Sequence, residues 1–367
     1  MWRSKERLRC DVLVYGVVLM KITIIGAGGR MGSWFTRYFY MRGYSLYIND
    51  IDGNALQALS SLLLEGKDVD GGGRGVEGER ERREGRGVEE RITIVNSSLL
   101  NDVKSNYTSS SYTILNNSDL VMLSLPMDMM PKAIHRVARY MHKGSILVEI
   151  SSLKHDVHRA LRDAVEKYGV KPLSLHPLFG PGADINAPNR FVLTPVIDGM
   201  EEESIAREVF PNATLIRVDD VDEHDRAMAI VLGMVYAMNI AFADLLECKD
   251  IALCKELAGS TFTLQSLIFE GIMNDDPRLF SSLLMNRHVK RYLKRFIAGN
   301  EHLLSCIYAK DRDALERIYS KVKHKIASCT DIEGSYRLMY MLLKEISGKR
   351  LVEEVKRRGG EGREGRE

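Results

Sequence analysis

A glycine-rich stretch between two strand-like segments constrains the fold of this chain more than any other feature. Residues 21–29, KITIIGAGG, are a short β-branched run that ends in glycines. Residues 33–44 then have helical spacing, and residues 45–50, SLYIND, form a second strand-like run. This order predicts a strand–helix–strand unit of a parallel sheet.

The glycines follow the first strand directly and open the helix. Backbone amides and the positive end of a helix can bind the pyrophosphate of a dinucleotide at such a turn. The strict G-x-G-x-x-G spacing fits only if Ala27 takes the first position, with Gly29 and Gly32 after it. A plain turn without a ligand is the alternative. The predicted cofactor-binding segment comprises Gly26, Ala27, Gly28, Gly29, Arg30, Met31 and Gly32.

An aspartate at the end of the second strand indicates which dinucleotide would bind. Asp50 lies eighteen residues after Gly32, where a carboxylate can accept hydrogen bonds from both ribose hydroxyls. Ile51 and Asp52 follow it instead of Arg or Lys, so a 2′-phosphate would meet negative charge. We therefore predict NAD rather than NADP. Two further cofactor candidates end a later apolar strand, beside the nicotinamide ribose: Ser124 and Pro126.

Strand-like runs alternate with helical segments through the first half of the chain. The runs are RITIV, DLVMLSLP, GSILVEI, KPLSLHP and RFVLTPVI. This alternation predicts an α/β domain with a Rossmann-type, doubly wound parallel sheet over residues 20–219. Residues 65–91 are Gly, Arg and Glu with almost nothing to bury, which predicts a disordered surface insertion; a charged docking segment is the alternative.

From Asp222 onward the pattern is helix-periodic without strand alternation. We expect an all-α domain over residues 222–346, with flexible extensions at 1–19 and 350–367. Its first helix is apolar on nearly every face, as in a buried central helix or a subunit interface. We favour the interface and predict a homodimer through this domain.

Composition excludes some classes of partner. The formal net charge is +2, which gives no general reason to expect a nucleic-acid or membrane partner. No stretch of about twenty apolar residues follows the first nineteen residues, so we expect no membrane-spanning helix. The cysteines lack a CxxC motif, which suits reduced core thiols in a cytoplasmic protein better than disulfides or a metal site. They are Cys10, Cys248, Cys254, Cys306 and Cys329.

A serine and a histidine follow successive apolar strands. Ligands of open α/β sheets bind beyond the carboxyl ends of the strands, so Ser152 and His176 can converge there. A histidine with a pKa of about 6.5 can accept a proton at neutral pH, and a hydroxyl can fix its tautomer. A structural histidine is the alternative for His176. We expect the other histidines to be mostly solvated: His135, His142, His155, His158, His224, His288, His302 and His324.

From about residue 20 to 340, apart from the insertion, the chain resembles the prephenate and arogenate dehydrogenase family of tyrosine biosynthesis. The motifs that carry this resemblance are IIGAGGRMGSWF, SDLVMLSLP, EISSLKHDV, LHPLFGPGA, DEHDRAMAIV and NDDPRLF. The resemblance implies a dinucleotide-binding domain, an α-helical dimerisation domain, and oxidative decarboxylation of prephenate to 4-hydroxyphenylpyruvate. It also implies that His176 is the catalytic histidine and that Ser152 hydrogen-bonds to it.

Substrate recognition is where this chain departs from the family pattern. A second family histidine falls at Tyr236, and an arginine before the DP pair falls at Gly271. Prephenate is a dianion, so another cation must take the place of the missing arginine. Lys154 is a candidate for binding a carboxylate or the cofactor, with a merely exposed lysine as the alternative. The other candidates are Arg190, Arg226, Arg287 and His288. Arogenate, another small acid, and a non-catalytic NAD-binding sensor remain open.

Overall fold

The computed structural model describes residues 13–14, 17–18, 20–65, 91–95 and 109–361. The predicted insertion at 65–91 therefore lies outside the described residues except at its two ends. The chain forms two compact units, Met1–Met228 and Ala229–Glu367. The division follows helix α7 (Val221–Met228), whereas the change in sequence pattern placed it near residue 222.

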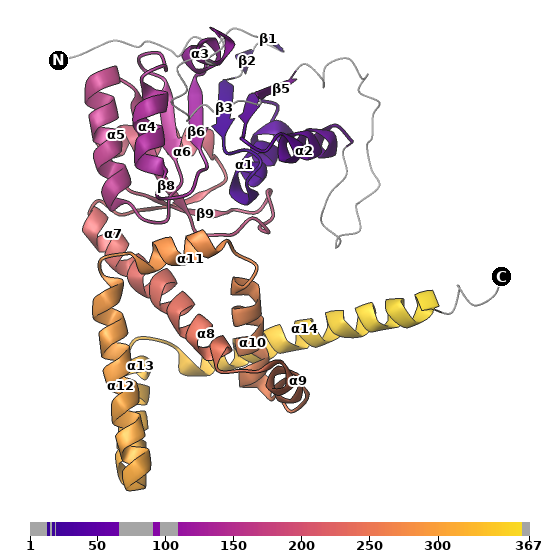
Figure 1. Cartoon of the computed structure of the whole chain (residues 1–367), viewed down its shortest axis with the longest axis vertical. Coiled ribbons are helices and arrows are strands. Elements are labelled where there is room, and N and C mark those ends of the chain that lie inside the picture. The colour runs from indigo at the N-terminus through magenta and orange to yellow at the C-terminus, as the bar shows by residue number, and fades with distance from the viewer. Residues whose placement is uncertain (1–12, 15–16, 19, 66–90, 96–108, 362–367) are drawn as a thin grey trace. The chain divides into compact units, whose positions relative to one another are not determined.

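The first unit is built on an eight-stranded sheet with the order β10-β9-β8-β7-β6-β3-β4-β5 (Figure 1). Parallel pairing runs from β5 through β4, β3, β6 and β7 to β8, which confirms the doubly wound Rossmann-type sheet. The strands are β3 (Lys21–Ile25), β4 (Ser45–Asn49), β5 (Ile92–Val95), β6 (Leu120–Leu123), β7 (Ile146–Glu149), β8 (Lys171–Pro177), β9 (Arg190–Leu193) and β10 (Thr214–Arg217). A separate two-stranded ribbon pairs β1 (Leu13–Val14) with β2 (Val17–Val18).

One end of the sheet differs from the prediction. Strand β9 is antiparallel to β8, and β10, which was not among the predicted strands, is parallel to β9. The chain returns from β8 to β9 through residues 178–189 without a helix. A parallel partner would require a crossover connection, usually a helix, so this link favours the antiparallel direction.

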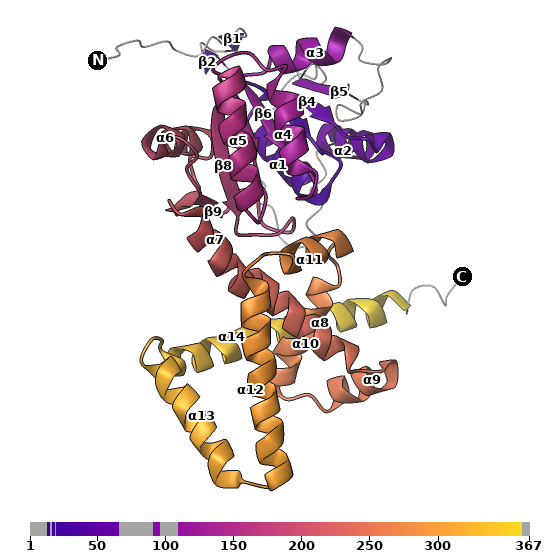
Figure 2. The same cartoon turned by 60° about the vertical axis from the view of Figure 1, so that its left-hand side comes forward.

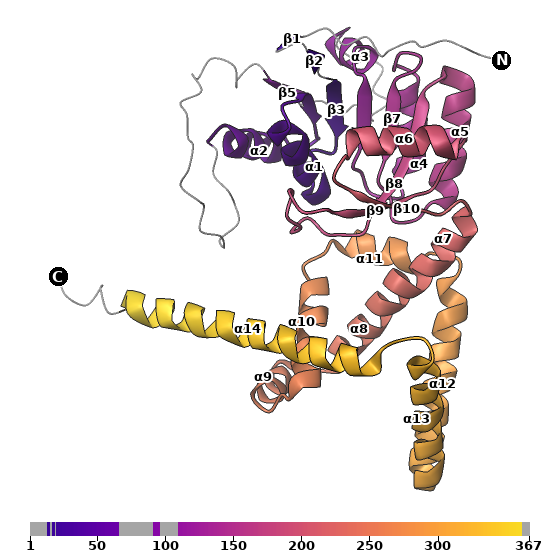
Figure 3. The ribbon, with the colours of Figure 1, turned by 180° about the vertical axis from the view of Figure 1, so that it is seen from behind.

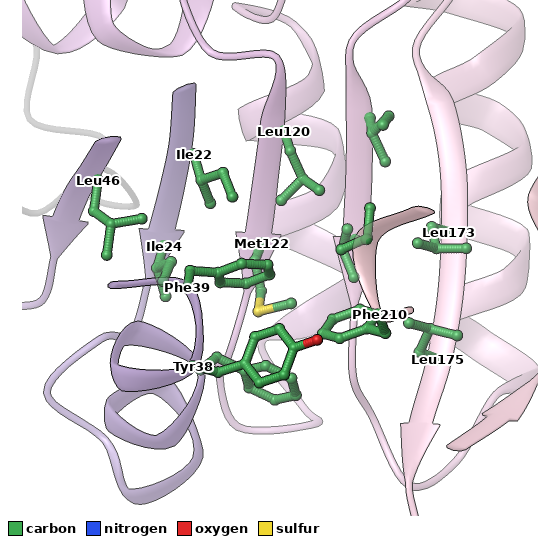
Figure 4. Close-up of a cluster of buried hydrophobic side chains, with 14 of the residues drawn as sticks. Ile22, Ile24, Tyr38, Phe39, Leu46, Leu120, Met122, Leu173, Leu175 and Phe210 are labelled. Carbon is green, nitrogen blue, oxygen red and sulfur yellow. The ribbon is translucent and has the colours of Figure 1, made fainter. Parts of the chain in front are cut away.

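Helices cover both faces of the sheet. One face packs against α1 (Arg30–Met41), α2 (Gly53–Glu65) and α6 (Gly199–Val209), and Figure 4 shows its buried side chains between sheet and helix. The other packs against α3 (Ser109–Asn116), α4 (Met130–Ala138) and α5 (His155–Tyr168). Figure 3 shows α1, α2 and α6 on the near side of the sheet. Strands covered on both faces bury their backbone, which leaves their carboxyl ends as the place for polar side chains.

The second unit is entirely helical in the part that the structure describes. Helices α12 and α13 form a hairpin whose arms meet at the connecting loop and diverge away from it (Figure 2). Helix α14 continues to Glu361, so the segment predicted as a flexible extension from residue 350 is helical as far as that residue. The elements are the π-helix η2 (Ala229–Met234), α8 (Val235–Asp244), α9 (Cys248–Glu256), α10 (Ser260–Ile272), α11 (Pro277–Leu284), α12 (Val289–Ala309), α13 (Arg312–Ala327) and α14 (Ile332–Glu361).

The apolar helix of the sequence analysis is the continuous segment Val221–Asp244. By length and composition alone it could cross a membrane, so the expectation that composition excludes a membrane-spanning helix is wrong. Only 28 % of its apolar window is buried within the chain. Most of this apolar window is therefore left unburied by its own chain. Its exposed apolar side chains include Ile230, Val231, Val235, Met238 and Phe242.

The cysteines only partly follow the prediction. The four described ones are free thiols. Cys306 is buried, but Cys248 and Cys329 are exposed, so the expectation that all are core residues is wrong. Cys248 is the first residue of α9, and Cys329 lies between α13 and α14. Cys10 lies outside the described residues.

Candidate active site

The glycine-rich turn lies between the ends of β3 and β6 and the start of α1. Gly26 has φ +83°, and a Cβ there would collide with the carbonyl oxygen of Ser124. A Cβ on Gly32 would collide with the carbonyl oxygen of Gly26. The amides of Gly26 and Ala27 both donate to the carbonyl of Asn49, at 2.8 and 3.0 Å. Only glycine therefore suits positions 26 and 32, because the backbone approaches too closely for any side chain.

The turn is suited to an anionic ligand. Gly29, the N-cap of α1, provides no side-chain cap, so first-turn amides can face a phosphate. Asp50 is half-buried at the end of β4, and its Oδ2 accepts a hydrogen bond of 2.9 Å from the Gly28 amide. Asp52 caps α2 through the amides of Asn54 and Ala55. Negative charge thus follows the second strand, as the preference for NAD requires.

The two remaining cofactor candidates also lie at this edge of the sheet. Ser124 directly follows β6, and its amide donates to the carbonyl of Ile25 at 2.9 Å, which places it beside Gly26. Pro126 is half-buried two residues further on. The structure thus brings the predicted residues of β3, β4 and β6 together, while their contact with a nucleotide stays a prediction.

His176 lies on β8 at the same edge, paired with Val192 of β9. It is 4 % exposed. Its Nδ1 lies 3.2 Å from Nε2 of His224, the hydrogen-bond partner that the structure gives this ring among the described residues. Ser152 is half-buried in the loop after β7, and no hydrogen bond between it and His176 occurs in the described part of the chain. That bond stays a prediction.

His224 and Asp225 of α7 were not predicted as site residues. His224 was expected to be solvated, and this is wrong because it is 2 % exposed. Its Nδ1 lies 2.9 Å from Oδ1 of Asp225. The Asp225 carboxylate also accepts the amides of Lys154 and His155, at 2.9 and 3.0 Å. The sequence signal was present in the adjacent His and Asp of the DEHDR motif.

Those two amides begin helix α5, whose N-cap residue, Lys154, makes no side-chain cap. Asp225 therefore supplies the cap from another helix and adds negative charge where the helix dipole is positive. Burial raises the pKa of Asp225, but the hydrogen bonds from His224 and from the Lys154 amide outweigh it, and the net pKa is lowered. The carboxylate is therefore held ionised beside His224.

Lys154 is fully buried, so the alternative of an exposed lysine is wrong. Its Nζ donates to Oε1 of Glu149 at 2.6 Å and to the carbonyl of Leu175 at 2.7 Å. The same Oε1 accepts the hydroxyl of Ser174 at 2.6 Å. Burial lowers the pKa of Lys154, while Glu149 opposes this shift. The ammonium thus already has two partners, and its predicted contact with a substrate carboxylate remains untested.

The ring of His176 is kept neutral by its surroundings. Burial lowers its pKa well below 6.5, and the nearby Lys154 and His224 lower it further. His176 can therefore accept a proton at neutral pH.

A second histidine, His158, was also expected to be solvated, and this is wrong: it is buried, with Nε2 3.0 Å from the Thr194 carbonyl. Burial lowers the pKa of His158 as well, and the Thr194 carbonyl partly offsets this shift.

A buried hydroxyl precedes Ser152. Ser151 is 4 % exposed, and its Oγ has no hydrogen-bond partner among the described residues. Its amide donates to Oε2 of Glu149 at 2.8 Å. The loop after β7 is therefore anchored on Glu149 through its backbone.

The loop after β8 is fixed to α1 by an indole. Trp34 is fully buried, and its Nε1 donates to the carbonyl of Ala183 at 2.8 Å. The Trp34 and Phe179 rings lie 4.7 Å apart. Phe179 and Ala183 belong to the FGPGA segment that directly follows the strand of His176.

The arginine candidates of the first unit lie on its surface. Arg190 begins β9 and Arg226 lies on α7, and both are exposed. In the helical unit, Tyr236 on α8 donates its hydroxyl to Oδ2 of Asp275 at 2.6 Å. Gly271 is exposed on α10, Arg287 is exposed, and His288 is half-buried. A carboxylate therefore lies beside Tyr236.

Two family models match the chain. Residues 94–206 match the nucleotide-binding domain of prephenate dehydrogenase, and residues 220–321 match its dimerization domain. The first match begins after the glycine-rich turn, so the turn lies outside it.

Two curated relatives are similar in sequence. A probable arogenate/prephenate dehydrogenase of Methanocaldococcus jannaschii is 23 % identical over 312 residues, which cover 83 % of this chain and 61 % of the relative. A protein of Haemophilus influenzae called T-protein is 24 % identical over 179 residues, which cover 48 % of this chain and 46 % of the relative. The chain thus spans about half to three fifths of the length of these relatives.

Solved structures share the fold. A prephenate dehydrogenase from A. aeolicus, in complex with hydroxyphenyl propionate and NAD+, aligns with a TM-score of 0.59 and 17 % identity over 84 % of this chain and 98 % of that one. A Synechocystis arogenate dehydrogenase aligns with a TM-score of 0.55 and 16 % identity over 83 % of this chain and 98 % of that one.

Proposed function

Because this chain belongs to the prephenate dehydrogenase family, we propose that it catalyses the NAD-dependent oxidative decarboxylation of prephenate to 4-hydroxyphenylpyruvate. The observation that carries this proposal is the position of His176. It is a buried, neutral imidazole at the same edge of the sheet as the glycine-rich turn. Oxidation of an alcohol removes a proton and a hydride. It therefore requires a base and a bound dinucleotide, and this edge of the sheet offers a place for both.

NAD, when bound, supplies the hydride acceptor. The turn at Gly26 to Gly32 and the first turn of α1 would hold its pyrophosphate. Asp50 would accept the ribose hydroxyls, and the acidic surroundings of that strand end disfavour NADP.

His176 acts on the ring hydroxyl of the substrate. It accepts the hydroxyl proton as the hydride leaves the same carbon, and the carbon–oxygen bond becomes a carbonyl. Loss of carbon dioxide then makes the ring aromatic and leaves its electron pair on that oxygen, which takes a proton back from His176. The imidazole therefore ends the cycle neutral, as the burial around it favours.

Arogenate is the second candidate substrate, and one observation favours it. It has an ammonium group where prephenate has a keto group. Asp275 accepts a hydrogen bond from Tyr236, and Tyr236 stands where the family has a histidine. Gly271 stands where the family has an arginine. A site that has this carboxylate and lacks that arginine suits an ammonium-bearing substrate better than a dianion.

We further propose a homodimer formed through the helical unit, acting in the cytoplasm. The apolar side chains of α8 support it, since Val235, Met238 and Phe242 recur on one helical face and are at least 36 % exposed. A contiguous apolar helix face that its own chain leaves open is typical of a subunit interface.

Steady-state assays of both acids with both nucleotides test the function. We expect the wild-type protein to oxidise prephenate with NAD. We expect His176→Asn to lower kcat by about 10²–10⁴-fold, with NAD affinity within about twofold, because general-base catalysis is lost while the nucleotide turn is intact. His135→Asn, which changes a half-exposed histidine on α4, is the control and should retain activity.

Three other results would each lead to a different conclusion. Oxidation of arogenate alone would replace prephenate by the second candidate. Oxidation of neither acid by a protein that still binds NAD would support the sensor hypothesis. Full activity of His176→Asn would exclude His176 as the base.

A further inference from the structure

We infer that His224 and Asp225 are positioning residues that hold the His176 imidazole in the tautomer with a proton on Nδ1 and a bare Nε2. The inference rests on the proposed function for its purpose, since it identifies Nε2 as the atom that accepts the substrate proton. Its starting point is the buried series of atoms from Asp225 through His224 to His176.

The order of protons follows from the one member that cannot donate. An ionised carboxylate only accepts, and Asp225 Oδ1 lies 2.9 Å from His224 Nδ1, so that nitrogen carries the proton. In a neutral ring, Nε2 of His224 is then an acceptor. It faces His176 Nδ1 at 3.2 Å, which must donate to it. The remaining nitrogen of His176, Nε2, is left with its lone pair.

A nearby ammonium keeps the ring of His176 neutral. Lys154 binds Glu149 and the carbonyl of Leu175, next to His176 in the chain. Glu149 is in turn held by Ser174 and by the Ser151 amide. Burial and this ammonium both lower the pKa of His176. A second proton on His176 is therefore disfavoured in the resting protein, which leaves its Nε2 bare.

Asp225 is held firmly enough for this task. It accepts two backbone amides at the start of α5 in addition to His224. His176, His224 and Asp225 are each at most 4 % exposed, so neither water nor side-chain rotation readily exchanges these partners. When His176 takes up the substrate proton, its ring donates to His224, which donates to this carboxylate, and the negative charge of Asp225 stabilises the positive charge of His176.

Nitrogen-15 NMR of histidine-labelled wild-type protein tests the tautomer directly, without any substrate. We expect His176 to show protonated Nδ1 and unprotonated Nε2 at pH 7.5. A wild-type spectrum with the proton on Nε2 of His176 would overturn the inference. Because this measurement needs no turnover, failure to oxidise prephenate or arogenate would refute the proposed function and leave the tautomer result standing.

The variant Asp225→Asn tests the consequence for catalysis. Its amide nitrogen can donate to His224 Nδ1, which reverses both bonds and puts a proton on His176 Nε2. We expect kcat to fall about 10²–10³-fold, with KM for the substrate and NAD affinity within about threefold, and the NMR signals of the two His176 nitrogens to exchange.

A matched cap variant separates positioning from stability. Asp198→Asn changes another N-cap aspartate of the first unit, which accepts the amides of Met200 and Glu201 at the start of α6. This substitution weakens a helix cap but contacts no imidazole. When both proteins are folded to the same extent, its kcat should equal that of the wild type. An Asp225→Asn variant that loses no more kcat than Asp198→Asn would overturn the inference. If Asp225→Asn fails to fold, His224→Gln provides the same comparison, with a loss of kcat expected and unchanged kcat contradicting the inference.

Discussion

The α/β unit buries most of its large apolar side chains, whereas the helical unit leaves many of its own in solvent. In the first, Trp34, Phe35 and Phe39 are fully buried, and even Lys154 has two partners. In the second, Leu257, Met285 and Tyr308 are at least 74 % exposed. The first unit thus resembles a finished globular domain, and the second has surfaces suited to a further chain.

The sharpest test of the enclosed unit is its buried ion pair. Replacing Lys154 with Met leaves the Glu149 carboxylate buried without its cation, so we expect the free energy of unfolding to fall by about 3–5 kcal/mol. Urea unfolding measures this change. The control, Lys171→Met, breaks an ion pair with Glu201 whose side chains are 41 % and 52 % exposed, and should cost less than about 1 kcal/mol. Equal losses in the two variants would contradict the proposed difference between buried and exposed pairs.

The helical unit should respond through association instead. The double variant Met238→Glu with Phe242→Glu puts two charges on the exposed apolar face of α8, 42 % and 36 % exposed in the single chain. Burying an unpaired charge in an interface is costly, so we expect the dimer Kd to rise about a hundredfold or more. Analytical ultracentrifugation measures it. Met200→Glu, an exposed position on α6, should leave association unchanged. An unaltered Kd in the double variant would exclude this face from the interface.

The smallest expected effect is the response of the first unit to acid. His176 has a pKa of about 6.5 when unfolded, and burial holds it lower in the folded chain. The unfolded state therefore binds more protons between those values, and stability falls as pH drops below about 6.5. Buried His158 acts in the same direction, whereas Asp225, with its lowered pKa, contributes only at lower pH, below about 3.8.

From pH 7.5 to 5.5, the wild-type free energy of unfolding should therefore drop by about 1 kcal/mol more than that of His176→Asn. Chemical unfolding at the two pH values measures this, with His135→Asn expected to behave like the wild type. Identical losses in the wild type and His176→Asn would show that His176 does not titrate between those values.

Local signals in the sequence were sufficient for much of the fold. The glycine turn and the β-branched runs are encoded by neighbouring residues, so β3 to β9 were predicted, and so was the helical second half. The direction of β9 and the existence of β10 depend on how the link after β8 returns, and short apolar runs do not specify it.

The site was harder to predict because burial is a property of the tertiary structure. His224 and Lys154 stand in polar sequence, at the start of α7 and α5, where exposure is the ordinary outcome. Asp225 binds the first amides of α5, and this contact between the two helices encloses His224. His176 was proposed because it follows an apolar strand that runs to the edge where open α/β sheets bind ligands, which is a local pattern.

The hydrogen bond from Trp34 to Ala183 has a consequence for how this protein can change over evolution. The helix that starts at the glycine-rich turn and the segment just past His176 are joined by one indole. A smaller residue at position 34 would lose this hydrogen bond and leave a cavity beside the FGPGA segment. We therefore expect a substitution on one side of this contact to require a compensating substitution on the other.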